Sequence, residues 1–154
     1  MEAYLIANIP LFLKMLLAVG LGAVIGTERT MAHKMAGLRT YALVSLGACV
    51  LSIISQSVLS QYGMSSGIDP MRMAAAIVMG IGFLCGGLII FHENKLSGLT
   101  TAAGMWVATG IGISVGYGFF TIAIISTLLT IFIFSTLWTF EEKMRDSAEL
   151  PKQN

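Results

Sequence analysis

The side chains of this chain that could do chemistry lie at the ends of long apolar segments. They occur in three stretches: GTERTMAHKMAGLRTYA from position 26, DPMR from position 69 and SGLTTAAG from position 97. Charged and hydroxyl side chains beside apolar helices are typical of ion pathways, small polar pockets and contacts with partner proteins. The candidate functional residues are Glu28, Arg29, Arg39, Thr40, Asp69, Arg72, Thr100 and Thr101.

The spacing of the histidines and cysteines does not indicate a metal site or an activated nucleophile. His33 and His92 are too far apart in the sequence for a zinc motif. Cys49 and Cys85 lie inside separate apolar segments without C-x-x-C spacing. Since neither histidine stands beside a recognisable nucleophile, we expect no enzyme activity, no bound metal and no cofactor.

Composition indicates where the chain resides. Hydrophobic residues make up 56% of its 154 residues, charged residues only 11%, and the mean hydropathy is +0.84. These values predict a membrane protein. A net charge of +1 gives no reason to expect nucleic acid as a partner.

Five apolar segments are each long enough to cross about 30 Å of hydrocarbon as a helix. Because the segments are continuously apolar rather than alternating, helices are favoured over barrel strands. We therefore expect an all-α membrane protein with a domain over 1–140 and a short cytosolic extension and tail over 141–154. The expected spans are residues 9–26, 40–58, 73–91, 99–116 and 119–140.

Lysines and arginines in the loops predict the orientation of these helices. They gather between the first and second spans, between the third and fourth, and after the fifth, whereas only Lys14 and Arg72 fall toward the other side. We expect the amino terminus outside and the carboxyl terminus in the cytosol. Glu28 and Asp69 then lie on opposite sides and cannot share one magnesium site.

An internal repeat relates the first two spans to the next two. GLGAVIG at 20 recurs sixty positions later as GIGFLCG, and GLRTYA at 37 recurs as GLTTAA at 98. These matches predict two related hairpins in a parallel repeat. The fifth span has no glycine and many bulky residues, so we expect it at the periphery, facing lipid.

Glycines spaced four apart predict close helix packing of the GxxxG type. A dinucleotide-binding loop is the alternative for G-x-G-x-x-x-G, but both copies lie inside spans and follow no strand. Packing is therefore favoured. The expected packing glycines are Gly22, Gly26, Gly82, Gly86, Gly104, Gly112 and Gly116.

The DPMR stretch is typical of a helix start, with Asp69 as N-cap and Pro70 at the first helical position. Arg72 fits this interpretation less well, because a cation near a helix amino terminus opposes the helix dipole. Its partner is left open: Asp69, a lipid phosphate or the interior of the bundle.

Two interpretations also apply to the loop 27–40. Its basic residues hold it in the cytosol, with Glu28 offsetting one of them. Alternatively, its polar groups share a small inward-facing pocket with Thr100 and Thr101, which the repeat places at the equivalent position of the second hairpin.

Taken together, GTER…AGLRTYALVSLGA, DPMRMAAAIVMGIGFLCGG and SGLTTAAGMWVATGIG resemble the MgtC/SapB family of bacterial inner-membrane proteins. The resemblance covers residues 11–116 and includes three motifs in the right order. Cys85 and Gly86 stand where many members have Gly and Ala, and Thr100 where virulence-associated members often have Asn. Residues matching the motifs are Glu28, Arg29, Gly37, Leu38, Arg39, Thr40, Asp69, Pro70, Arg72, Gly80, Gly82, Phe83, Gly87, Gly98, Leu99, Thr101, Ala102 and Ala103.

The resemblance implies a role in magnesium homeostasis, stress adaptation or virulence, through regulation of another membrane protein such as the proton-translocating ATP synthase. The soluble carboxyl-terminal domain of the virulence-associated members is not expected here. The expected partners are the lipid bilayer and either another membrane protein or a second copy of the chain. An ion or small-solute transporter or channel is the alternative function, and the identity of any small-molecule ligand stays open.

Overall fold

The computed structural model describes residues 2–62, 69, 71–92, 95–138, 140, 143 and 144. Five α-helices account for most of these residues, and a short antiparallel β-hairpin joins the third helix to the fourth. The elements are α1 (Glu2–Met31), α2 (Leu38–Tyr62), α3 (Arg72–Leu88), β1 (Ile90–His92), β2 (Lys95–Ser97), α4 (Leu99–Tyr117) and α5 (Phe120–Phe132), which continues as a π-helical segment (Ile133–Leu137).

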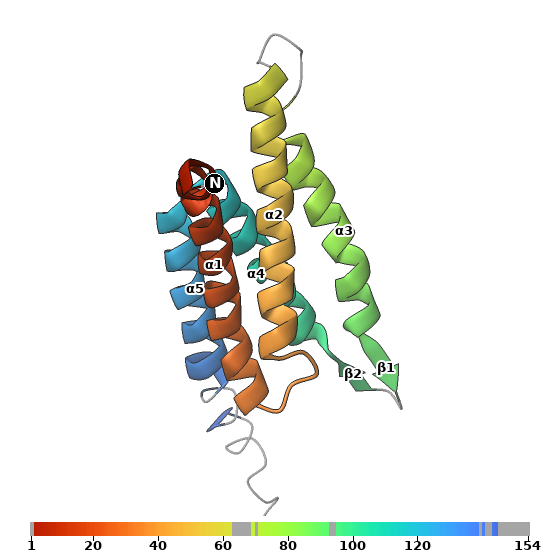
Figure 1. Ribbon diagram of the computed structural model, residues 1–154. Helices are drawn as coiled ribbons and strands as arrows, with labels where there is room; N and C mark the ends of the chain where they lie inside the picture. Colours follow the sequence, from red (N-terminus) through yellow and green to blue (C-terminus); the bar gives the residue numbers. More distant parts are fainter. Residues whose placement is uncertain are drawn as a thin grey trace, which may run out of the picture.

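Successive helices run in opposite directions (Figure 1). The α1–α2 loop, the β-hairpin and the carboxyl end of α5 gather at one end of the bundle, which we call the hairpin end. The carboxyl end of α2 and the start of α3 lie at the opposite end. This arrangement separates the two groups of charged candidates by the length of the bundle.

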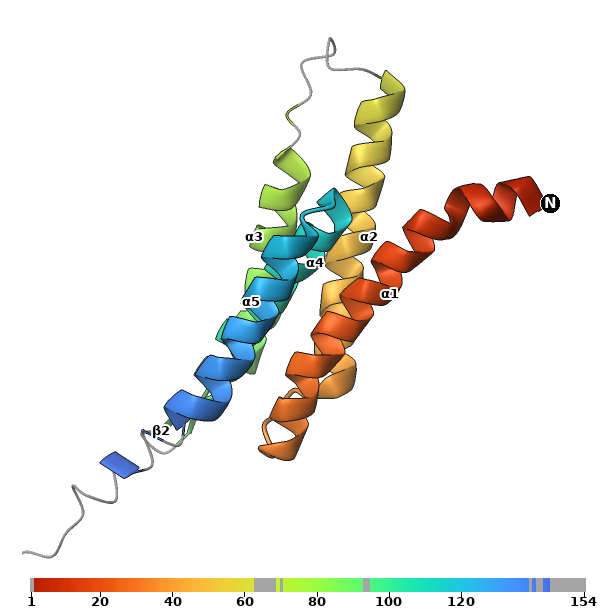
Figure 2. The ribbon, with the colours of Figure 1, turned by 90° about the vertical axis from the view of Figure 1, so that its left-hand side faces the viewer.

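Helix α1 bends before it joins the bundle (Figure 2). Pro10 lies inside this helix. A proline has no N–H to donate and its ring clashes with the preceding turn, which makes it a usual cause of a helix kink.

Four helical segments within the described residues are long and apolar enough to cross a membrane: Asn8–Met31, Leu38–Tyr62, Leu99–Tyr117 and Phe120–Leu137. Together with the predominantly helical fold, they make this an all-α membrane protein. The expected span over 73–91 is wrong at its carboxyl end, because α3 stops at Leu88 after 17 residues and a strand follows. That α3 also crosses the membrane stays a prediction.

Helix α4 is the centre of the bundle, since it packs against α1, α2, α3 and α5. A Cβ atom added at Gly112 would meet the carbonyl oxygen of Ser45, and one at Gly116 would lie 2.8 Å from that of Cys49. These contacts bring the backbones of α2 and α4 together. Because lipid gives helices no hydrophobic drive to associate, such close van der Waals packing supplies much of their attraction.

Glycines in α1 approach α2 just as closely. A Cβ atom at Gly22 would lie 2.6 Å from the carbonyl oxygen of Tyr41, and one at Gly26 would lie 2.6 Å from the Cα atom of Leu38. Gly104 of α4 also faces α2, since a Cβ atom built there would lie 2.5 Å from the hydroxyl oxygen of Tyr41.

Two of the expected packing glycines are placed differently. Nothing lies within 4 Å of a Cβ atom built at Gly82 or Gly86, and both positions are exposed. Helix α3 stands at one side of the bundle (Figure 1). Helix α5 stands at the other side (Figure 1). Small and hydroxyl side chains of α5 are buried, although hydropathy did not indicate a buried face on this helix. They are Ala123, Thr127 and Thr130.

Candidate functional site

The carboxyl end of α1 shapes the first part of the site. His33 adopts a left-handed conformation with φ of 53°. Its N–H donates to the carbonyl of Thr30 (3.1 Å), and the N–H of Lys34 donates to the carbonyl of Arg29 (3.0 Å). This pair of bonds is a Schellman motif, which reverses the chain and satisfies the last carbonyls of the helix. Lys34 is thereby brought back over Arg29.

The amino end of α4 forms the opposite wall. Gly98 precedes the helix with φ of 85°, and a Cβ atom there would meet the carbonyl oxygen of Leu88. A side chain is disfavoured at this position both by the backbone conformation and by the close approach. Helix α4, which has Gly98 as its N-cap, carries Thr100 and Thr101 in its first turn.

A π-helical segment at the end of α5 supplies the aromatic part of the site. π-Helical turns are rare and often occur at functional sites. Phe134 lies in this segment and is buried. The guanidinium carbon of Arg29 lies 4.3 Å from the centre of its ring, within the range of a cation–π contact.

Arg29 is the centre of the cluster, with an exposed fraction of only 3%. Its Nη2 donates to the hydroxyl of Thr101 at 3.3 Å, and its Nη1 lies 3.7 Å from Oε2 of Glu28. The hydroxyl of Tyr41 donates to the carbonyl of Thr101 at 3.1 Å. The cluster thus ties α1 and α2 to the first turn of α4.

Two polar atoms of the cluster have no hydrogen-bond partner among the described residues. They are Nε of Arg29 and Oε2 of Glu28, and both are buried. A buried donor or acceptor without a partner costs about 1–3 kcal/mol. Native proteins leave few buried polar groups unpaired, so these two atoms mark the cluster as a candidate site.

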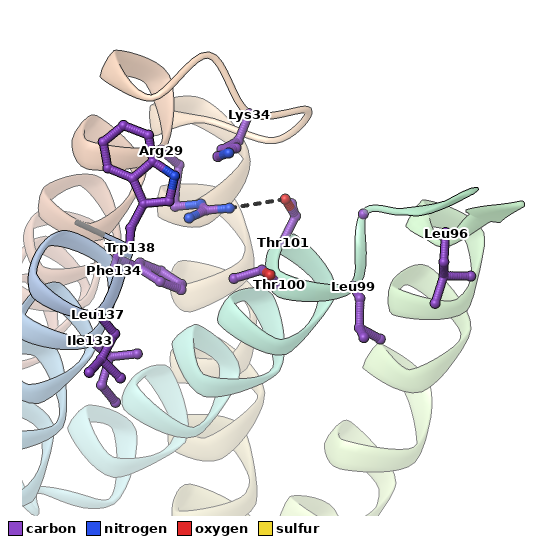
Figure 3. A pocket seen from close by; sticks show the side chains of 11 residues that line it. Arg29, Lys34, Leu96, Leu99, Thr100, Thr101, Ile133, Phe134, Leu137 and Trp138 are labelled. Carbon is purple, nitrogen blue, oxygen red and sulfur yellow. Dashed lines mark hydrogen bonds between the residues drawn. The ribbon is translucent and has the colours of Figure 1, made fainter. Parts of the chain in front are cut away.

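A cavity of about 390 Å³ opens beside this cluster (Figure 3). Arg29 reaches across from α1 toward Thr101, Phe134 lies under its guanidinium group, and Lys34 stands on the loop side. Apolar side chains from β2, α4 and the end of α5 complete the lining. We call it the Arg29 pocket, and its principal lining residues are Arg29, Lys34, Thr100, Thr101, Phe134 and Trp138.

Part of the polar group predicted from sequence does come together here. Thr100 and Thr101 line the pocket with Arg29, and Glu28 pairs with Arg29. Arg39 is exposed, and neither it nor Thr40 is among the lining residues.

Sequence reasoning missed several members of the site: Lys34, Tyr41, Phe134 and Trp138. Trp138 had a signal, since its position suited an interfacial aromatic residue. Phe134 had none, because it is one of many apolar residues in its span.

The second predicted group lies at the opposite end of the bundle. Oδ1 of Asp69 accepts a hydrogen bond from the N–H of Met71 (2.9 Å), and α3 begins at Arg72 with Met71 as its N-cap. The expectation of Asp69 as N-cap is therefore corrected by two residues, and Pro70 lies outside the described residues. Both charged residues line a groove of about 320 Å³ between α2 and α3, and no ion pair joins these two described side chains.

Another cation at that end has a role that sequence did not suggest. Nζ of Lys14 donates to the carbonyl oxygen of Gly116 at 3.1 Å. This carbonyl belongs to the last turn of α4, where carbonyl groups lack partners within the helix and attract cations. Lys14 thus ties α1 to the end of α4.

The part of the chain that the structure describes contains no cluster of metal-binding side chains. No group of three or more His, Cys, Asp and Glu side chains there is arranged to hold a metal ion. His33 is exposed, and Cys49 and Cys85 lie on α2 and α3 as free thiols.

Comparison with known proteins gives consistent matches. The family model described as MgtC family matches residues 15–143. A protein of Haemophilus influenzae is 46% identical over 123 residues, which cover 77% of this chain and 52% of that protein. "Protein MgtC" of Salmonella typhimurium (strain LT2) is 43% identical over 120 residues, which cover 78% of this chain and 49% of that protein.

A third relative carries a functional description in its name. "Putative magnesium transporter YhiD" of Escherichia coli (strain K12) is 38% identical over 125 residues, which cover 77% of this chain and 55% of the relative. The chain thus spans about half the length of these relatives. No solved structure matches it.

Proposed function

This chain belongs to the MgtC family, and from that premise we propose that it regulates another membrane protein without catalysing a reaction itself. Magnesium homeostasis or stress adaptation is the proposed setting, and the proton-translocating ATP synthase is one example of a target. The proposed location is the bacterial inner membrane, with the amino terminus outside and the carboxyl terminus in the cytosol. The basic residues at the hairpin end, among them Arg29, Lys34 and Arg39, support this orientation.

The observation that carries the proposal is the open face of α3. Gly82 and Gly86 on this helix have no neighbour within 4 Å of a Cβ position. Met79 and Phe83 beside them are 73% and 85% exposed. Gly112 and Gly116 of α4 have the same four-residue spacing, and the backbone of α2 packs against both of them.

An open small-residue face in lipid is suited to receive another helix. Glycine lowers helix propensity by about 1 kcal/mol relative to alanine, so unpacked glycines bring α3 no benefit within the chain. Close approach of a partner helix would recover that cost through van der Waals contact. We therefore assign the face to a transmembrane helix of the regulated protein.

Affinity purification with crosslinking from membranes of magnesium-starved cells, followed by mass spectrometry, tests this proposal. Wild type should capture a membrane protein that Gly82→Leu and Gly86→Leu fail to capture. Gly20→Leu is the matched control, because Gly20 is also without neighbours but lies on α1. Equal capture by all three variants would contradict docking at α3. Capture of only a second copy of the chain would indicate self-association instead.

Transport is the second candidate function, because one relative carries the name "Putative magnesium transporter YhiD". Magnesium binds through oxygen ligands, usually one or two carboxylates with several waters. The partly buried Glu28 is the carboxylate of the Arg29 cluster, and its pairing with Arg29 disfavours a cation there. Magnesium flux into proteoliposomes containing only this chain would establish transport and displace the regulator proposal.

A further inference from the structure

We propose that the Arg29 pocket is a binding site for a phosphate group at the membrane surface. The inference goes beyond docking at α3, because it concerns the hairpin end of the bundle and a ligand instead of a partner helix. It depends on three features of the pocket: its charge, the uncapped start of α4 and its apolar wall.

Charge in the pocket is positive. Arg29 and Lys34 line it. Glu28 is the carboxylate facing Arg29, at 3.7 Å. Two cations against one carboxylate leave one positive charge for an anion to neutralise. Arg29 also has donor capacity left over, since it is 97% buried yet its Nε has no hydrogen-bond partner among the described residues.

The start of α4 adds a second attraction for an anion. No side chain caps this helix, and its first backbone bond runs from the N–H of Ala102 to the carbonyl of Gly98 (2.9 Å). The N–H groups of the first turn therefore have no partner within the helix. Such groups and the positive end of the helix dipole form a ready anion site. The hydroxyls of Thr100 and Thr101 lie in that same turn, beside the cavity.

The apolar wall indicates how the phosphate group is presented. Phe134 and Trp138 face the pocket together with leucine and isoleucine side chains. Trp138 and Leu99 are about half exposed, so the wall continues onto the outer surface of the bundle. A phosphate ester that carries apolar groups, such as a phospholipid with its acyl chains, matches both parts of the site. Free phosphate shares the polar chemistry and lacks the apolar contact.

The test uses the full chain in detergent and has two arms. In the first, native mass spectrometry measures retention of phosphatidylglycerol. In the second, calorimetry measures binding of inorganic phosphate. The variants are Arg29→Gln and Lys34→Gln. Arg39→Gln is the matched control, because Arg39 is an exposed cation near the same loop and does not line the pocket.

We expect Arg29→Gln and Lys34→Gln to weaken binding about tenfold, the effect of losing one charge-assisted hydrogen bond, while Arg39→Gln binds as wild type does. Binding of phosphatidylglycerol alone would identify the source as a headgroup, and binding of inorganic phosphate as well would extend it to free phosphate. Because Lys34 is exposed on a loop, its variant remains informative if Arg29→Gln fails to fold. Wild-type binding by Lys34→Gln, equal loss in Arg39→Gln, or no binding by wild type in either arm would overturn the proposal.

Discussion

Replacement of Gly112 by alanine should destabilise the bundle strongly. The added Cβ atom would meet the backbone carbonyl of Ser45 and would lie 2.9 Å from the Cβ of Ala48. Neither is the far end of a flexible side chain, so α2 and α4 must move apart. Inserting one carbon into a well-packed core costs about 1–3 kcal/mol. Because the obstacle here is backbone, we expect the upper part of that range.

Gly110 provides a matched control on the same helix. A Cβ atom at Gly110 would meet nothing within 4 Å. Alanine there should leave stability unchanged or raise it by up to about 1 kcal/mol, through its higher helix propensity. Gly82→Ala should behave in the same way, because its surroundings are also open.

Equilibrium unfolding in mixed micelles of mild detergent and dodecyl sulfate, followed by circular dichroism, measures these differences. The free energy of unfolding should fall by about 2–3 kcal/mol in Gly112→Ala and should not fall in the two controls. Equal stability of Gly112→Ala and Gly110→Ala would refute the argument that α4 is held to α2 by backbone approach at glycine.

Three further predictions concern the ends of the bundle. Tyr41→Phe removes the hydroxyl that donates to a buried carbonyl of α4, and should lower the free energy of unfolding by about 1–2 kcal/mol in the same assay. Lys14→Met removes the cation at the carboxyl end of α4, and should cost about 1 kcal/mol, a loss that Lys14→Arg should largely avoid. In a background without native cysteines, Gln61→Cys should react with a membrane-impermeant maleimide added outside intact cells, whereas Met35→Cys should not; the reverse pattern would invert the proposed orientation.

Hydropathy located the helices but could not determine where α3 ends. Averaged over a span, IIFH after Leu88 is as apolar as the helix before it. Two glycines precede this stretch, which weakens the helix, and the β-branched and aromatic residues that follow favour a strand. Phe91 pairs with Leu96 across the β-hairpin. This pairing depends on a segment farther along the chain, so a window centred on 73–91 does not detect it.

The pocket was predictable in part. One of the two interpretations of the loop 27–40 placed its polar groups in a pocket with Thr101, and Arg29 forms a hydrogen bond with that residue. Phe134 was not predictable, since it meets Arg29 from a π-helical segment that hydropathy does not indicate. The position of Lys34 over the pocket depends on a Schellman motif at the end of α1. In that motif histidine, instead of the usual glycine, takes the left-handed conformation.

Glycine spacing alone also could not separate buried faces from open ones. Gly22 and Gly82 correspond in the repeat expected from the sequence, yet a Cβ atom at Gly22 would meet the backbone of α2 and one at Gly82 would meet nothing within 4 Å. The difference comes from what stands opposite each helix, which is a property of the whole bundle. A small-residue face therefore predicts a capacity for close approach, and only the fold determines whether the chain itself uses it.

Helix α3, which carries the open face, and the Arg29 pocket both contact the first turn of α4. The thiol of Cys85 on α3 donates to the carbonyl of Ala102 (3.3 Å), and the carbonyl of Leu88 lies against Gly98. Thr101, which binds Arg29, is in the same turn. A partner helix that shifts α3 would act on this turn directly, since Gly98 leaves no space between the two backbones. Docking at α3 and ligand binding in the pocket are therefore expected to influence each other through contacts that already exist in the chain.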